Sequence, residues 1–146
     1  MCSSDLPART PGPMGRLNSR QSFSAVTGAC MLITRECLAA TGGLDEAFAI
    51  AYNDIDFCLR AGHSGFRVIW TPFATLYHHE SASRGSDETP ANIERFRREQ
   101  AMLRERYALT DFVDPAYSPW YARNDSGPRL LHPTSLPPER TFWSRR

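Results

Sequence analysis

The clearest pattern of hydrophobic positions along the chain covers residues 90–107. An apolar stripe recurs there at alternating steps of three and four residues, the spacing of one helix face: Ile93, Phe96, Gln100, Leu103 and Tyr107. Thr89 and Pro90 form a favourable helix start, with a capping side chain followed by proline at the first helical position. The pattern predicts a helix whose stripe docks on the rest of the protein. The charges between these positions, Glu99 among them, are typical of a solvated face.

A shorter amphipathic segment covers residues 53–62. Its apolar and small residues fall on one helical face: Ile55, Cys58, Leu59 and Gly62. We expect Asn53 to be the N-cap, and Asp54 and Asp56 then lie in the first turn, where acids suit the helix dipole. The ordinary role of such acids is capping. Carboxylates at the edge of an element can equally be held toward a cleft, so both interpretations stay open.

Apolar runs of strand length occupy the remaining positions. Residues 29–33 are continuously apolar after Gly28, which indicates either a close backbone approach or a bulge. Residues 66–70 are rich in strand formers and stop before Pro72, and residues 74–78 can form a further extended segment. Thr34 can cap a helix over 35–40 that ends at Gly42. Strands alternating with helices predict an α/β fold.

Both ends of the chain lack these patterns. Residues 1–22 are polar and rich in proline and glycine, so we expect a disordered leader, and its first six residues resemble translated sequencing-adapter sequence. We expect an ordered part over 23–110 and an extended, mobile tail over 111–146. About three strands are few for an independent α/β sheet, which favours the view that half a domain lies upstream.

Composition and net charge limit the classes of function that the chain can have. The net charge of +1 gives no reason to expect a nucleic-acid partner, and all 17 basic residues are arginine, which excludes lysine chemistry. No apolar run approaches the ~20 residues that a transmembrane segment needs. The cysteines form no Cys-x-x-Cys pair, and Cys30, Cys37 and Cys58 lie among apolar neighbours. We expect them to be buried thiols in a reducing, cytoplasmic compartment.

Residues 26–84 resemble the C-terminal half of family 2 glycosyltransferases with the GT-A fold, particularly bacterial rhamnosyl- or O-antigen-type enzymes. The likeness is carried, in order, by VTGACMLI at 26–33, GGLDE at 42–46, YNDIDFCLR at 52–60, GFRV at 65–68, TP at 71–72 and YHHES at 77–81. The order and spacing of these pieces make the likeness specific. It implies that this region is the acceptor-side part of an α/β glycosyltransferase domain.

The resemblance implies roles for individual residues. Asp54 matches the general base of the family's acid-rich helix start, Asn53 replaces the usual glutamate, and Asp56 is a supporting residue. His78 matches the histidine that helps ligate Mg²⁺ or Mn²⁺, with His79 as its neighbour. The expected substrate-binding residues are Gly28, Ala29, Trp70 and Arg84.

The implied reaction is inverting transfer of a sugar from a nucleotide-sugar donor to a glycan acceptor, in surface polysaccharide synthesis. The implied location is cytoplasmic, with the inner face of the membrane as an option. The family's nucleotide-binding half and its Asp-x-Asp motif are absent, because the only such motif here is Asp54-Ile55-Asp56. We therefore expect the chain alone to be inactive.

Two other classes of function stay open. A zinc site from Cys58, His63, His78 and His79 is conceivable, although the spacing fits no common finger. A non-catalytic, glycosyltransferase-like module that binds sugar or a partner is the second, because Asn53 replaces the usual glutamate. An intact Asp-x-Asp motif after an upstream strand would favour the enzyme.

Overall fold

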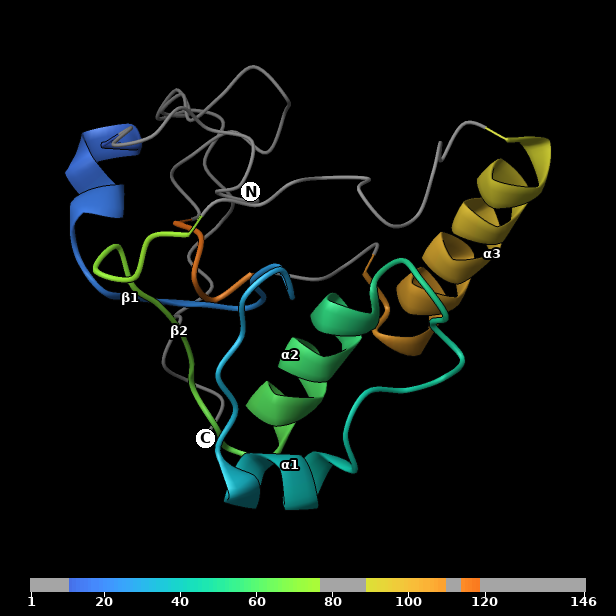
Figure 1. Ribbon diagram of the computed structural model, residues 1–146, viewed down its shortest axis with the longest axis horizontal. Helices are drawn as coiled ribbons and strands as arrows, with labels where there is room; N and C mark the ends of the chain where they lie inside the picture. The colour runs from blue at the N-terminus through green and yellow to red at the C-terminus, as the bar shows by residue number, and fades with distance from the viewer. Residues whose placement is uncertain (1–10, 77–88, 110–113, 119–146) are drawn as a thin grey trace, which may run out of the picture. The chain divides into compact units, whose positions relative to one another are not determined.

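The computed structural model describes residues 11–76, 89–109 and 114–118. The chain divides into two compact units, Met1–Phe112 and Val113–Arg146, and every helix and strand described lies in the first. The elements in order are η2 (Pro13–Asn18), β1 (Gln21–Phe23), α1 (Arg35–Thr41), α2 (Asn53–His63), β2 (Val68–Trp70) and α3 (Pro90–Arg106) (Figure 1). In the second unit, Tyr117 N donates to Asp114 O in a turn. The predicted α/β class is confirmed.

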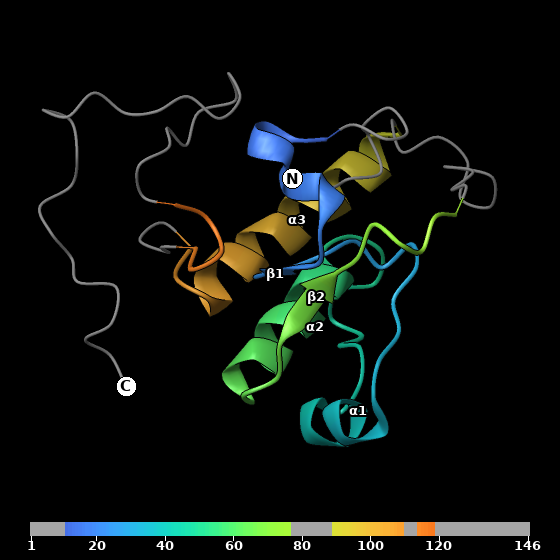
Figure 2. The same ribbon diagram turned by 90° about the vertical axis from the view of Figure 1, so that its left-hand side faces the viewer.

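The sheet consists of β1 and β2, which pair antiparallel and lie side by side in both views (Figures 1 and 2). Phe23 lies opposite Val68, and the ring of Phe23 packs edge-to-face on Trp70 with centroids 6.4 Å apart. The strand predicted over 66–70 is therefore confirmed for its last three residues. The sequence predicts disorder before residue 23, but the structure contains η2 there, and Gln21 and Ser22 pair with β2. Pairing with a distant strand can stabilise a strand that has little local pattern of its own.

The strand predicted over 29–33 is wrong. Residues 28–30 form a turn, and Met31 and Ile33 pack on a cluster of Cys37, Phe57 and Ala61 instead of pairing in a sheet. An apolar run of this length has no period that separates a strand from a loop anchored in the core. In the segment predicted over 74–78, residues 74–76 show no strand, and residues 77 and 78 lie outside the described part.

The short helix α1 follows its predicted caps. Thr34 Oγ1 accepts a hydrogen bond from Cys37 N at 3.2 Å, and Gly42 ends the helix with φ +75°. That left-handed conformation is inexpensive only for glycine, which explains the residue at this position. α1 packs against α2, and α2 packs against β2.

α2 begins one residue earlier than predicted. Asn53 is the first helical residue, and the N-cap is Tyr52, whose φ of +63° is left-handed and whose side chain makes no capping hydrogen bond. Asn53 is therefore not the cap. The helix buries Phe57, Cys58 and Ala61, and it ends at His63. Cys37 and Cys58 are buried as expected, whereas Cys30 is exposed.

The helix predicted over 90–107 is confirmed as α3, with Thr89 Oγ1 accepting from Asn92 N at 3.3 Å. Only part of the predicted stripe is buried. Leu103 is 4% exposed, but Ile93 and Phe96 are 41% and 47% exposed. Glu99 is buried at 2% exposure, so its expected place on a solvated face is wrong. Within the described ranges, no helix is long and apolar enough to cross a membrane.

Candidate functional site

Asp54 lies in the first turn of α2, partly exposed, with each carboxylate oxygen held by a backbone amide. Gly28 N donates to Oδ2 at 2.7 Å, and Ile55 N donates to Oδ1 at 2.8 Å. A carboxylate offers about four acceptor positions, so two remain for a further donor. The side chain is thus fixed in direction while it can still accept a proton or a hydrogen bond from a ligand.

Gly28 explains how the loop reaches Asp54. A Cβ placed on Gly28 would lie 3.2 Å from Asp54 Cβ, tighter than an ordinary van der Waals contact. Of the two interpretations of this glycine, the close backbone approach is the one observed. Gly28 and Ala29 are both exposed beside the Asp54 carboxylate, and Ala29 N donates to Thr27 Oγ1 at 3.4 Å. The structure therefore brings Gly28 and Asp54 into contact, and Ala29 follows Gly28 in the same turn.

Asp56, two residues further along α2, has a different environment. It is fully buried, and its carboxylate accepts from Arg60 Nε at 2.7 Å, Arg106 Nη1 at 2.8 Å and Tyr107 Oη at 2.6 Å. Arg106 Nη1 also donates to Asp45 at 2.6 Å. Asp56 therefore joins α2 to the end of α3 and to the turn at Asp45. A ligand cannot reach it, which leaves Asp54 as the accessible acid of the pair.

The electrostatics of this cluster follow from its contacts. Burial, and then the hydrogen bond to Asp56, raise the pKa of Tyr107 to about 12. The hydrogen bond from Ala47 N, and then that from Arg106, lower the pKa of Asp45 below its ordinary value. Hydrogen bonds to Asp45 and Asp56 raise the pKa of Arg106. Across the neutral range Tyr107 therefore stays neutral, while Asp45 and Arg106 stay charged.

The loop that precedes Asp54 is held by α3. Glu99 Oε2 accepts from Ala51 N at 2.7 Å, and Gln100 Nε2 donates to Tyr52 Oη at 3.2 Å. The Tyr52 ring also packs on Phe96, with centroids 5.1 Å apart, and burial raises the pKa of Tyr52. These contacts stabilise the left-handed backbone of Tyr52, a conformation that costs on the order of 1–3 kcal/mol for a non-glycine residue.

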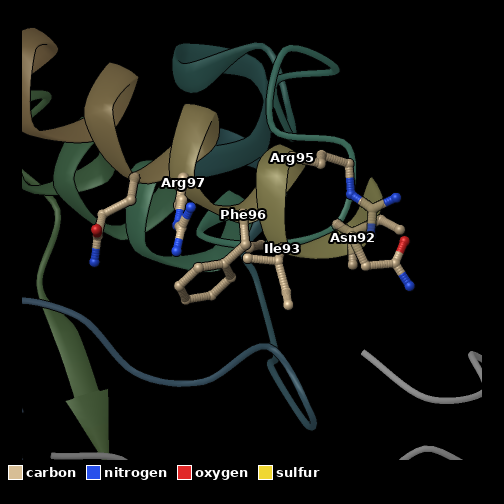
Figure 3. Close-up of a pocket in the computed structure, with 8 residues that line it drawn as sticks. Asn92, Ile93, Arg95, Phe96 and Arg97 are labelled. Carbon is tan, nitrogen blue, oxygen red and sulfur yellow. The ribbon is translucent and has the colours of Figure 1, made fainter. Parts of the chain in front are cut away.

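A groove lies beside this loop, between residues 50–51 and the exposed face of α3 (Figure 3). Its volume is about 490 Å³. Eight residues line it: Ile50, Ala51, Asn92, Ile93, Arg95, Phe96, Arg97 and Gln100. Ile50 and Ala51 thus line the groove, and the chain continues from them through Tyr52 into α2, which carries Asp54.

The other predicted site residues are placed elsewhere or lie outside the described part. Trp70 is at the end of β2, where it packs on Phe23. The expected metal ligand His78 and the expected substrate contact Arg84 fall in residues 77–88, which the structure does not describe. Asn53 begins α2 next to Asp54.

The zinc alternative draws on Cys58 and His63, together with His78 and His79. The buried Cys58 thiol is 3.9 Å from Val26 O, and burial raises its pKa, whereas His63 stacks on Tyr107 with centroids 6.0 Å apart. Among residues 11–76, 89–109 and 114–118, no three His, Cys, Asp or Glu side chains group closely enough to hold a metal ion. The described residues therefore do not by themselves fit a metal site.

Several residues of this region were not predicted from sequence. The i,i+4 spacing of Asp56 and Arg60 was a usable signal for their ion pair. Glu99, Arg106 and Tyr107 contact α2 or its preceding loop from about fifty residues away, and no local pattern reports such contacts. Buried acids paired across helices are recognised only once the helices are placed.

Comparison with known proteins shows which family the chain matches. Residues 7–107, more than half of the chain, match the family described as "Glycosyltransferase like family 2". The match includes Gly28, Asp54 and all of α2 and α3. No solved structure matches the chain.

Three curated relatives are similar to parts of the chain. An uncharacterized protein of Sinorhizobium fredii, y4gI, is 48% identical over 89% of this chain and 15% of its own length. The O-antigen biosynthesis protein RfbC of Myxococcus xanthus is 38% identical over 53% of this chain and 6% of its own. The N-acetylglucosaminyl-diphospho-decaprenol L-rhamnosyltransferase of Mycobacterium tuberculosis is 30% identical over 47% of this chain and 22% of its own length.

The chain therefore spans less than a quarter of the length of each of these relatives. In the described part of the chain, three α-helices and a two-stranded sheet form an α/β structure consistent with part of a GT-A domain. The resemblance to rhamnosyl- and O-antigen-type proteins is confirmed by the second and third relatives. On the extent of the family match, the chain belongs to glycosyltransferase-like family 2.

Proposed function

We propose that this chain is the acceptor-side part of an inverting glycosyltransferase, with Asp54 as its general base. The donor is a nucleotide sugar, and the acceptor is a lipid-linked glycan used in surface polysaccharide synthesis. The names of two relatives support this choice, since one acts in O-antigen biosynthesis and the other transfers L-rhamnose to a diphospho-decaprenol acceptor. The free thiols Cys30, Cys37 and Cys58 suit a reducing, cytoplasmic compartment.

One observation carries the proposal: of the two acids in the first turn of α2, only Asp54 is accessible to a substrate. Its carboxylate accepts the proton of the acceptor hydroxyl while that oxygen attacks the anomeric carbon. A new carbon–oxygen bond forms as the bond to the nucleoside diphosphate breaks from the opposite side, which inverts the configuration. A positioned base of this kind typically contributes ~10²–10⁴-fold to the rate.

We propose His78 as a ligand of Mg²⁺ or Mn²⁺. Such an ion stabilises the charge of the leaving diphosphate when it is bound. Among the described residues, Asp56 is enclosed, and no three His, Cys, Asp or Glu side chains group closely enough to hold a metal ion there. The proposal therefore rests on the resemblance around residues 77–81 alone.

We further propose that the chain needs a nucleotide-binding part supplied by additional sequence. The described surface supports this, because six large apolar side chains outside the groove on α3 are exposed: Leu32, Leu38, Leu44, Ile69, Phe73 and Leu76. Apolar surface in such quantity is typical of faces that other protein covers. The short share of each relative's length supports it as well.

A sugar-transfer assay tests this function. The 146-residue chain and the chain joined to its upstream coding sequence are given labelled nucleotide sugars, including activated L-rhamnose, and N-acetylglucosaminyl-diphospho-polyprenol. Transfer is expected only from the longer protein, and His78→Ala should shift its Mn²⁺ titration to higher concentration. An unchanged titration would remove His78 as a ligand. No transfer by a longer protein that has an intact Asp-x-Asp motif would favour the non-catalytic binding module.

A further inference from the structure

The groove on α3 has an apolar floor. Phe96 and Ile93 lie side by side in it (Figure 3), and both are about half exposed. Ile50 also lines the groove. Its volume of about 490 Å³ lies within the range of roughly 300–1,000 Å³ found for small-molecule sites. A floor of this kind stabilises a bound apolar chain by removing it from water.

The rim of the groove is positively charged. Figure 3 shows Arg97 on one side of Phe96 and Ile93, and Arg95 with Asn92 on the other. The acid of this face, Glu99, is buried and accepts from Ala51 N, and its other oxygen lies 3.9 Å from Arg95 Nε. Two guanidinium groups therefore flank an apolar floor, an arrangement that favours an anionic head group with an apolar tail.

The groove is coupled to the base through the 50–52 loop. Ala51 lines the groove and stands three residues before Asp54, while Gln100 lines it and also donates to Tyr52 Oη. Tyr52 is the N-cap of the helix that carries Asp54. A ligand in the groove therefore lies against the segment that positions the base.

From this geometry we infer that the groove binds the diphosphate and the first isoprene units of a polyprenyl-diphosphate acceptor. Arg95 and Arg97 contact the diphosphate, and Phe96, Ile93 and Ile50 contact the prenyl chain. This inference rests on the proposed function, whose acceptor it places beside Asp54. A nucleoside diphosphate offers the same charge but no apolar tail, so it matches only the rim.

Calorimetric titration of the full chain with farnesyl diphosphate, inorganic pyrophosphate and uridine diphosphate tests the site. Farnesyl diphosphate should bind about tenfold or more tightly than either of the other two, because it alone adds apolar burial. Arg97→Gln and Ile93→Ser should each weaken its binding by about tenfold. Both side chains are exposed, so the fold should survive, and circular dichroism checks this. The matched control is Arg98→Gln, because Arg98 is exposed on the same helix and does not line the groove.

Equal affinity for farnesyl diphosphate in the Arg97→Gln and Arg98→Gln variants would overturn the inference. Pyrophosphate or uridine diphosphate binding as tightly as farnesyl diphosphate would also overturn it. Asp54→Asn separates the two proposals, because it should remove transfer by the longer protein and leave farnesyl diphosphate binding unchanged. Active Asp54→Asn enzyme would contradict the base alone, whereas insensitivity to Arg97→Gln would contradict the groove alone.

Discussion

At the scale of single residues, Asp54 and Asp56 show how one turn of a helix places two acids in different environments. Asp54 faces the Gly28 loop and keeps acceptor capacity, while Asp56 faces α3 and is enclosed by Arg60, Arg106 and Tyr107. Residues two apart on a helix lie about 200° around its axis, so the same local sequence presents them to different surroundings. In the proposed function, only the partly exposed Asp54 is placed for chemistry.

Replacing Gly28 by alanine should disturb Asp54 more than the fold. The new Cβ would press on Asp54 Cβ at 3.2 Å, so the carboxylate or the loop must move by a few tenths of an ångström. We expect sugar transfer to fall by about tenfold or more, since misplaced reacting groups are costly. The matched control is Gly62→Ala, because nothing lies within 4 Å of its Cβ position. It should keep activity and stabilise α2 by about 0.5–1 kcal/mol. Equal activity in both variants would contradict the role of Gly28.

Tyr107 should make the stability of the protein fall measurably at alkaline pH. Its pKa is raised to about 12 in the fold, against about 10 in an unfolded chain. The neutral phenol therefore contributes stability fully below pH 10, and this contribution is lost as the pH rises from about 10 to 12. Urea unfolding at several pH values should show that Tyr107→Phe flattens this decline. The control is Tyr117→Phe. If the free energy of unfolding of Tyr107→Phe declined with pH as steeply as that of the unsubstituted protein, the Tyr107–Asp56 contact would be contradicted.

At the scale of elements, α3 supports the loop that precedes Asp54. Its buried residues, Glu99 and Leu103, hold it to the rest of the unit, and Glu99 fixes the backbone of Ala51. The exposed residues Ile93 and Phe96 are left to form the floor of the groove. The helix thus contributes structure on one side and a candidate binding surface on the other.

Glu99 should be far more important for stability than other acids of α3. Glu99→Ala leaves Ala51 N without its acceptor, which costs about 1–3 kcal/mol in a partly buried place. Glu105→Ala, at an exposed position, should change the free energy of unfolding by less than about 0.5 kcal/mol. Urea denaturation measures both. Equal, small changes in the free energy of unfolding of the two variants would show that Glu99 does not stabilise this loop.

Helices were more predictable here than strands. Thr34, Gly42, Thr89 and Pro90 are local signals, and each functions at the helix end where the sequence placed it. The run over 29–33 has no such signal, because an apolar segment can enter a core as a strand or as a loop. Burial of Glu99 was also beyond prediction, since its contact with Ala51 depends on how two distant segments pack.

At the scale of the whole molecule, the described part has a small core and a large apolar surface. Six apolar residues are buried: Cys37, Phe48, Phe57, Cys58, Ala61 and Leu103. The Asp56 cluster supplements them by joining α2, α3 and the Asp45 turn through one carboxylate. Removal of one partner from such a buried charged cluster typically costs several kcal/mol, so Asp56 stabilises the unit rather than the transition state.

The most direct test of the account compares Asp54→Asn with Asp56→Asn in the protein that carries the upstream sequence. We predict that Asp54→Asn lowers sugar transfer by ~10²–10⁴-fold. It should lower the free energy of unfolding by only about 1 kcal/mol, because the amide oxygen of Asn can keep one of the two backbone hydrogen bonds. Asp56→Asn should instead lower the free energy of unfolding by about 2–4 kcal/mol. Turnover by Asp54→Asn close to that of the native protein, measured with saturating donor and acceptor, would contradict the assignment of Asp54 as the base.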